Sequence, residues 1–333
     1  MTMIDFVTVT VPCELPFPID GGMLIDHDED GQIRFAIRKH LAVEGSFSGK
    51  MMLRAISVDE LELSGNPAKF LAGHNIYGSD NLRSVIARCL EVILTEVCGY
   101  MPYVNIGKGK LTRVDVTDGY ILDRPDDVTA YLRALSQTAR IAYKGRGVLE
   151  ESTLVFGRSA KGQRAKDWQI VMYAKGLEVA KRPLPPIMME DEEVRDWVAR
   201  LLRVEVRLRS RELERLGLKS VKSWDVGTAA EIWADKIGKL DMSEVRELKT
   251  EELEHVKPRL RCAYAAWRHG EDLAKGMKRA SFYRLRRELK DNLGVDIAVP
   301  VPKSNVVPLV RVLEARPAMR PSWADRIDRA LSA

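Results

Sequence analysis

Two short segments of the sequence share one pattern and restrict how the chain can fold. They read Arg113-Val-Asp-Val116 and Arg203-Val-Glu-Val206, so that a carboxylate stands between two valines in each. Alternating β-branched residues are typical of strands, and alternate side chains of a strand share one face. Each segment therefore predicts a strand with an apolar face and a charged face. If the two strands are neighbours, Asp115 and Glu205 converge on one face of a sheet, among arginines.

Two interpretations of that charged face remain open from the residues alone. Paired carboxylates on adjoining strands could hold a divalent metal ion against a phosphodiester. The alternative is a pair of solvated polar faces that are joined only by ion pairs.

Composition narrows the class of protein. The 333 residues are enough for two domains and a connecting region, and 45% hydrophobic with 30% charged residues is typical of a globular protein. No apolar run is long enough to cross a bilayer, and the N-terminus lacks the basic and apolar regions of a signal peptide. The four cysteines show no zinc-site spacing. We therefore expect a cytoplasmic protein with no membrane partner.

Hydrophobic periodicity predicts the order of the elements. Strands are expected over residues 4–11, 33–37, 50–56, 60–63, 111–116, 153–156, 168–173 and 202–209. Helices are expected over residues 80–97, 126–142, 190–199, 225–240, 242–256, 259–269, 271–277 and 281–292, with Ser79 and Ser281 as N-caps. Helix followed by strand, twice, among other strands indicates an α+β sandwich with one open sheet face.

Positive charge is concentrated near the C-terminus. Between Lys257 and Lys290, eleven lysines and arginines stand against three acidic residues, which suggests a polyanionic partner. Two short helices followed by a basic third one match the proportions of a helix-turn-helix. The side chains expected to contact DNA are Arg279, Ser281, Tyr283, Arg284, Arg287 and Lys290. A structural three-helix unit with a basic surface is the alternative.

The run Gly65-Asn-Pro-Ala-Lys-Phe-Leu-Ala-Gly-His-Asn-Ile-Tyr-Gly-Ser-Asp80 resembles the signature of the gene II/X replication initiators of filamentous phages. Further segments are similar to that family in the same order, and the resemblance covers roughly residues 1–297. These segments are Arg113–Val116, Trp168–Glu178, Leu202–Leu208, Trp267–Leu273, Ser281–Leu289 and Gly294–Ile297.

This resemblance implies a rolling-circle replication initiator, an endonuclease that nicks the plus strand of a phage genome at its origin and rejoins the displaced circle. It implies a ferredoxin-like, HUH-type antiparallel sheet with helices on one face in residues 1–218. A helical DNA-binding module with a helix-turn-helix would occupy residues 219–298, and a proline-punctuated tail residues 299–333. The implied partners are double-stranded origin DNA, displaced single-stranded DNA, and a helicase and polymerase of the bacterial host.

The resemblance also implies roles for particular residues. Asp115 and Glu205 would hold Mg²⁺ or Mn²⁺, and His74 would be a third ligand or a phosphate contact. Oxygen ligands suit these two ions better than zinc.

The nucleophile is where the sequence departs from the family. Relatives carry a tyrosine at the position of Val155, and no tyrosine lies in residues 150–162. Tyr173, on the adjoining strand, is then the expected catalytic tyrosine, and Lys175, two residues later, is expected in the catalytic set with Asp115 and Glu205. Tyr77 and Tyr143 are weaker candidates for the nucleophile, and water is another. The departure favours an alternative function, a non-catalytic DNA-binding replication regulator that retains the fold. A third alternative is an RNA-binding or structural protein.

Overall fold

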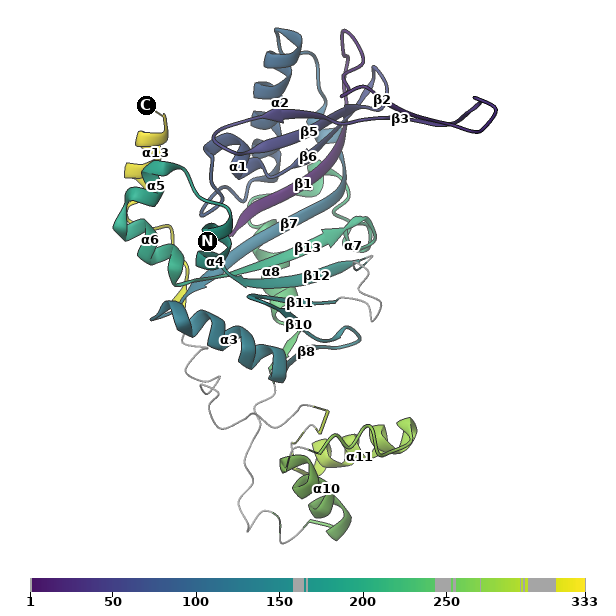
Figure 1. Cartoon of the computed structure of the whole chain (residues 1–333), viewed down its shortest axis with the longest axis vertical. Helices are drawn as coiled ribbons and strands as arrows, with labels where there is room; N and C mark the ends of the chain where they lie inside the picture. Colours follow the sequence, from purple (N-terminus) through teal and green to yellow (C-terminus); the bar gives the residue numbers. More distant parts are fainter. Residues whose placement is uncertain are drawn as a thin grey trace.

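The computed structural model describes residues 2–157, 165, 167–242, 253, 256–269, 271–293, 295, 297–298 and 316–332. Within these residues, an antiparallel sheet of ten strands dominates the fold (Figure 1). Its spatial order is β10-β11-β12-β13-β7-β1-β6-β5-β4, and β15 pairs with β7. The strands are β1 (Met3–Pro12), β4 (Leu41–Glu44), β5 (Lys50–Ala55), β6 (Glu60–Gly65), β7 (Lys110–Ile121), β10 (Val148–Glu150), β11 (Thr153–Phe156), β12 (Trp168–Ala174), β13 (Leu201–Arg209) and β15 (Arg316–Pro317).

The two strands with the shared sequence pattern are neighbours in the sheet. β7 and β13 pair in antiparallel fashion, with Asp115 opposite Arg207 and Glu205 opposite Thr117. Directly opposed residues lie on the same face of a sheet. The two carboxylates are therefore diagonal neighbours on one face, while the valines between them point to the other.

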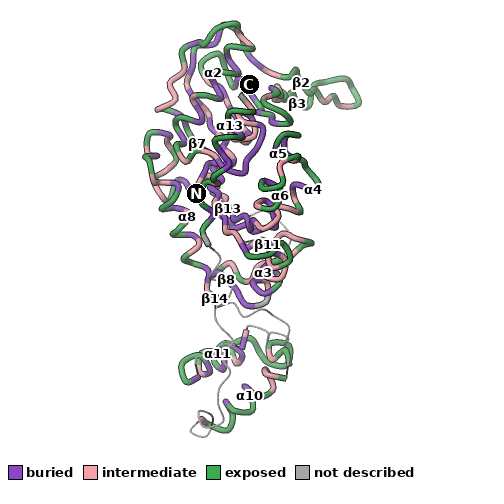
Figure 2. Tube along the Cα trace, turned by 90° about the vertical axis from the view of Figure 1, so that its left-hand side faces the viewer, coloured by how far each residue is buried: buried purple, intermediate pink, exposed green. Residues whose placement is uncertain are grey.

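Helices cover the apolar face of the sheet. α2 (Leu82–Cys98), α3 (Pro125–Thr138) and α8 (Thr228–Ile237) contribute side chains to the same core as the strands (Figures 1 and 2). The strands supply valines at alternate positions, and the helices supply a stripe of leucine and isoleucine. Each fully buried side chain of this kind contributes about 1.5–3 kcal/mol. A mixed α+β fold with a large antiparallel sheet is thus confirmed, and the ferredoxin-like, HUH-type assignment stays a prediction.

Several predicted helix ends were wrong. The N-cap of α2 is Asn81, whose side chain accepts from the backbone N–H of Ser84, rather than Ser79. The helix predicted to reach residue 142 ends at Thr138, because the following residues form β8 (Ala139–Ile141). β8 pairs with β9 (Gly145–Arg146) and with β14 (Leu240–Met242), so the helix predicted up to residue 240 also ends early. Tertiary pairing here overrides helix propensity.

The structure also contains shorter helical elements that the periodicity did not indicate. They include α1 (Pro67–Ala72), α4 (Lys175–Lys181), α5 (Pro186–Glu190), α7 (Ser210–Arg215), and the 3₁₀ turns η1 (Ile106–Lys108) and η2 (Val221–Ser223). The predicted helix after the proline-rich linker is α6 (Glu192–Ala199). A hairpin of β2 (Met23–His27) and β3 (Ile33–Arg38) projects from the sheet (Figure 1).

The end of the chain returns to the sheet. β15 pairs with β7, and α13 (Ala324–Ser332) packs against α5 and α6, with Trp323 and Ile327 buried between them. At the other predicted boundary, Trp224 and the buried residues of α8 belong to the core of the sheet. The division at residues 218 and 298 stays a prediction, and packing crosses it at both places.

The basic segment forms a hydrophobic core of its own, separate from that of the sheet. α10 (Pro258–Arg268) and α11 (Arg279–Leu293) pack through Tyr264, Trp267 and Phe282, with three leucines of α11. The helix predicted over residues 271–277 is absent, because the described residues 271–278 form turns. Ser281 lies inside α11 rather than capping it. Most of the helix predicted over residues 242–256 falls outside the described residues.

Among the described helices, none combines the length and the apolar character that crossing a membrane would require.

Candidate active site

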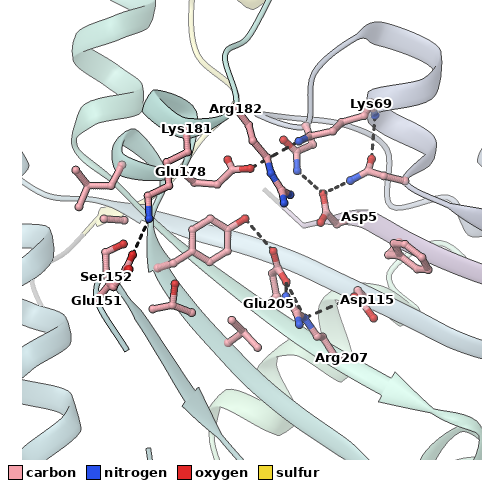
Figure 3. Close-up of a pocket in the computed structure, with 18 of the residues that line it drawn as sticks. Asp5, Lys69, Asp115, Glu151, Ser152, Glu178, Lys181, Arg182, Glu205 and Arg207 are labelled. Carbon is pink, nitrogen blue, oxygen red and sulfur yellow. Dashed lines mark hydrogen bonds and ion pairs between the residues drawn. The ribbon is translucent and has the colours of Figure 1, made fainter. Parts of the chain in front are cut away.

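A cavity of about 450 Å³ opens on the polar face of the sheet (Figure 3). Strands β1, β7, β12 and β13 form its floor, and α1 and α4 stand at its side. Its walls include five carboxylates, the phenol of one tyrosine and several cationic side chains. The floor carries three of the carboxylates and the tyrosine, namely Asp5, Asp115, Glu205 and Tyr173, and the cations include Arg113 and Arg207.

Asp115 is only 2% exposed and is held by two arginines. The Arg113 guanidinium donates to both carboxylate oxygens, with Nε 2.8 Å from Oδ1, and stacks on the Phe6 ring at 3.8 Å. Nε of Arg207 lies 3.7 Å from Oδ2. Burial raises the pKa of Asp115 to about 6, against the opposing effect of the two guanidinium groups.

Glu205 joins the tyrosine to the arginine. Its Oε1 accepts a hydrogen bond of 2.8 Å from the Tyr173 hydroxyl, and its Oε2 accepts two from Arg207, at 2.7 and 2.9 Å. Burial, followed by the charges of Glu205 and Asp5, raises the pKa of Tyr173 well above its usual value. The phenol is therefore protonated at neutral pH and is bound to a carboxylate that can take its proton.

Asp5 is a member of this site that the sequence reasoning missed. A β-bulge between Ile4 and Phe6 breaks the pairing of β1 with β7, and bulges commonly redirect a side chain. Asp5 thereby lines the cavity beside Phe6, although the residues that follow alternate between the apolar core and the polar face. The sequence signal that could have identified Asp5 is a carboxylate among apolar residues at the beginning of a strand. The pattern of alternation pointed Asp5 toward the core.

Asn75 connects Asp5 to Lys175. Its Nδ2 donates to Asp5 Oδ1 at 2.8 Å, and its Oδ1 accepts from Lys175 Nζ at 2.9 Å. Its backbone carbonyl accepts from Arg203, which also binds the carbonyl of Ile76 at 3.0 Å. Asn75 lies in the family signature, but the sequence predicted a role there only for its neighbour His74.

Lys175 begins α4 and is fully buried. Besides Asn75, its ammonium binds Glu178 Oε2 at 2.6 Å. Burial, followed by the charge of the nearby Arg203 guanidinium, lowers the pKa of Lys175 to about 8. Lys175 therefore connects two residues of the cavity lining, Asn75 and Glu178.

Val155 occupies the position where the family pattern expects a tyrosine. It pairs with Val171 of β12, which lines the cavity two residues before Tyr173. Val155 thus shares the polar face but stands one strand further from Glu205. Tyr173 presents its hydroxyl to the same face from the neighbouring strand.

The structure does not bring His74 together with the two carboxylates. His74 lines a separate cavity of about 650 Å³, with Tyr77, Arg320 and Asp328 of the C-terminal segment. It is 1% exposed, its ring meets that of Tyr77 at 4.5 Å, and burial lowers its pKa to about 4. Tyr77 donates to Asp328 at 2.7 Å, away from the first cavity. Tyr143 is fully exposed on the β8–β9 turn.

The donor chemistry of the first cavity suits a hard cation. Within the described residues, no group of three or more histidine, cysteine or acidic side chains is arranged to hold a metal ion. Asp115 and Glu205 nevertheless provide two oxygen donors on one face, and Mg²⁺ is commonly bound by one or two carboxylates together with substrate phosphates. Arg207 is bound to both carboxylates, so any such cation shares them with a guanidinium.

The predicted DNA-contacting side chains lie along α11. Tyr283, Arg284, Arg287 and Lys290 are exposed on it, as is Arg279 at its start, while Ser281 is half-buried. The opposite side of the helix is apolar: Phe282, Leu285 and Leu289 are buried and pack on α10. The sequence therefore predicted correctly which side of α11 faces solvent.

An antiparallel sheet with helices on one face and a cavity of carboxylates, arginines and a tyrosine on the other defines a class: α+β proteins with a charged site on an open sheet face. Residues 3–227 match the N-terminal part of the phage replication-associated proteins of the gene II type, and residues 255–326 match the C-terminal part of the same proteins. The chain belongs to this phage replication protein family.

Two known proteins illustrate the similarity. The replication-associated gene II protein of Enterobacteria phage I2-2 is 33% identical over 342 residues, which cover 98% of this chain and 97% of the phage protein. The solved structure of a rolling-circle replication initiator protein from Geobacillus stearothermophilus covers 90% of this chain and 99% of its own. Its TM-score of 0.37 and identity of 12% are too low to define a shared fold.

Proposed function

We propose that this protein is an origin-specific DNA endonuclease that starts rolling-circle replication of a phage genome by nicking one strand. Membership of the gene II replication protein family supports a role in DNA replication. The observation that carries the chemical part of the proposal is the 2.8 Å hydrogen bond from the Tyr173 hydroxyl to Glu205, inside a cavity lined by arginines.

In this reaction the Tyr173 oxygen attacks phosphorus while Glu205 accepts the phenolic proton. The phosphorus–oxygen bond of the scissile linkage breaks, and the leaving oxygen takes up a proton to become a free hydroxyl. The other DNA end is held as a phosphotyrosine ester. Attack of a DNA hydroxyl on that ester reverses the step and rejoins a strand. Because burial raises the pKa of Tyr173, proton removal by Glu205 has to accompany the attack.

Positive charge in the cavity supports binding of a phosphodiester. Arg113 and Arg207 present planar guanidinium groups, which match phosphate geometry. Asp115 and Glu205 are the residues that would hold Mg²⁺ or Mn²⁺, and a bound cation would polarise the scissile phosphate and stabilise its developing charge. His74 lies outside this set. Lys175, through Asn75, keeps Asp5 in place.

The basic side of α11 is proposed to grip duplex DNA near the origin. Its exposed arginines and lysine suit phosphate contacts, which position a protein on DNA. Origin DNA and the strand displaced from it are then the partners of this chain.

The test uses supercoiled plasmid carrying the phage origin, purified protein, and Mn²⁺ or Mg²⁺. We expect relaxation of the plasmid, a protein–DNA adduct that survives denaturation, and peptide mapping of the adduct to Tyr173. Asp115→Asn and Glu205→Gln should each stop relaxation, and thermal unfolding measured in parallel shows that both variants are folded.

Each other outcome points to a different conclusion. Origin binding without cleavage under every metal supports the non-catalytic regulator. Normal nicking by both carboxylate variants excludes the assigned metal site. An adduct on another tyrosine retains the reaction but removes Tyr173 from it. Preference for single-stranded RNA over origin DNA favours the RNA-binding alternative.

A further inference from the structure

Arg207 lies where a cation bound by Asp115 and Glu205 would sit. Its guanidinium donates to Glu205 through two nitrogens, at 2.7 and 2.9 Å, and its Nε is 3.7 Å from Asp115 Oδ2 (Figure 3). A single side chain thus contacts both of the carboxylates that the pairing of β7 and β13 brings together. With Arg113 on the far side of Asp115, two guanidinium groups already balance the two carboxylates.

Because two guanidinium groups already neutralise the two carboxylates, binding of a divalent cation there is disfavoured. A cation placed between the carboxylates would meet the positive charge of Arg207 at close range, in a site where the carboxylates are almost fully buried and screening by solvent is weak. The cation and the guanidinium therefore compete for the same oxygens.

The cavity also leaves space into which the Arg207 side chain can move. Its side chain is 29% exposed and lines the 450 Å³ cavity. Arg203, on the same face of the same strand, differs: it is 2% exposed and is bound to two backbone carbonyls. On this face of β13, Arg203 is therefore fixed by its partners, whereas Arg207 borders the open space of the cavity.

We propose that Arg207 is a resident counter-cation, which leaves Asp115 and Glu205 when a divalent cation binds and then takes up a phosphate of the DNA strand. The inference rests on the proposed function, since it assigns a metal and a phosphodiester to this cavity. The guanidinium that loses its carboxylates keeps five donors, and a phosphate is the acceptor best matched to them. Because coupling between two ligands is reciprocal, DNA tightens metal binding by the same factor as metal tightens DNA binding.

The experiment measures binding of Mn²⁺ to the full chain at pH 8 without DNA, by the electron paramagnetic resonance signal of free Mn²⁺. Arg207→Gln should bind Mn²⁺ about tenfold more tightly than the wild type, because the competing charge is gone. Arg182→Gln is the matched control: it removes a charge from the same cavity wall and should change the Kd by less than twofold. A short single-stranded oligonucleotide should tighten Mn²⁺ binding to the wild type but not to Arg207→Gln.

Unchanged or weaker Mn²⁺ binding by folded Arg207→Gln overturns the proposal, as does equal tightening by Arg182→Gln. If Arg207→Gln does not fold, Arg207→Lys decides, because lysine retains the charge but loses the two-point contact with Glu205; its Kd should fall about twofold to threefold, and no fall overturns the proposal. A protein that nicks DNA but shows no effect of Arg207 refutes this inference alone. A protein with the expected Mn²⁺ competition but no nicking refutes the proposed function alone.

Discussion

The cavity on the sheet and the basic side of α11 both carry many charges, but they arrange them in opposite ways. In the cavity, Asp115 and Glu205 are buried and held by arginines at hydrogen-bond distance. On α11, Arg284, Arg287 and Lys290 are exposed to solvent. The first arrangement fixes the positions of atoms, as bond-breaking chemistry requires. The second provides attraction without a fixed geometry, which suits phosphate contacts along a duplex. Substitutions should therefore act very differently in the two regions.

The largest expected effect is that of Tyr173→Phe. The change removes the oxygen that we propose as nucleophile and leaves the aromatic ring in place. Nicking should fall by at least about a thousandfold, and the covalent adduct should disappear, since no nucleophile remains. Gel analysis of denatured reactions measures both. Tyr143→Phe, at the exposed turn, is the control and should nick normally. Persistence of the adduct in Tyr173→Phe would show that another group attacks.

The next largest effect is expected for Asn75→Ala, which tests whether the cavity depends on internal pairing. The change leaves Asp5 and buried Lys175 without their shared amide partner. Hydrogen bonds to charged groups contribute about 1.5–3 kcal/mol each, so the free energy of unfolding should fall by about 3–5 kcal/mol. Urea unfolding provides the measurement.

A matched control for that variant is Asn81→Ala, which removes only the exposed N-cap of α2. Its expected loss is about 1 kcal/mol. Equal losses in the two asparagine variants would mean that the cavity network adds nothing beyond ordinary hydrogen bonding.

A somewhat smaller effect is expected when pH changes the charge of Lys175 and, with it, the free energy of unfolding. Burial lowers the pKa of Lys175 to about 8 in the folded protein, whereas the pKa of this lysine in the unfolded chain is the ordinary 10.5. Between these two pH values the unfolded chain binds a proton at Lys175 that the folded protein does not bind. The contribution of Lys175 to the free energy of unfolding is therefore highest above pH 10.5, and this stability is lost as pH falls through 8. Relative to Lys175→Met, the wild type should gain about 3 kcal/mol in free energy of unfolding between pH 8 and 10.5. Parallel stability curves for the two proteins would contradict this burial penalty.

The smallest effects are expected on α11. Arg284→Ala and Arg287→Ala should each weaken origin binding by about threefold to tenfold and reduce the slope of log affinity against log salt by about 0.9. Fluorescence anisotropy at several salt concentrations measures both. Arg83→Ala removes an exposed arginine from α2 and should leave the slope unchanged. If all three variants share the wild-type slope, α11 does not contact DNA.

Local sequence patterns determined most of the strands and the faces of the main helices. Period-two alternation placed Asp115 and Glu205 on the polar faces of two strands, and a three-residue to four-residue spacing placed Phe282, Leu285 and Leu289 on the buried side of α11. These predictions hold because an apolar face has to be buried wherever its element lies in the fold. Exposure of the basic side of α11 follows from the same rule.

Only the tertiary structure decided which side chains meet. That β7 and β13 are neighbours, that Arg207 lies between their carboxylates, and that a bulge turns Asp5 into the cavity all depend on strand order and register. Separation of His74 from the cavity, pairing of β15 with the sheet and packing of α13 on α5 and α6 depend on contacts between residues far apart in the chain. No local pattern encodes such contacts, because burial selects apolar side chains by type but not by partner. The two carboxylates could therefore be predicted from the sequence, whereas the contact of Arg207 with both of them could not.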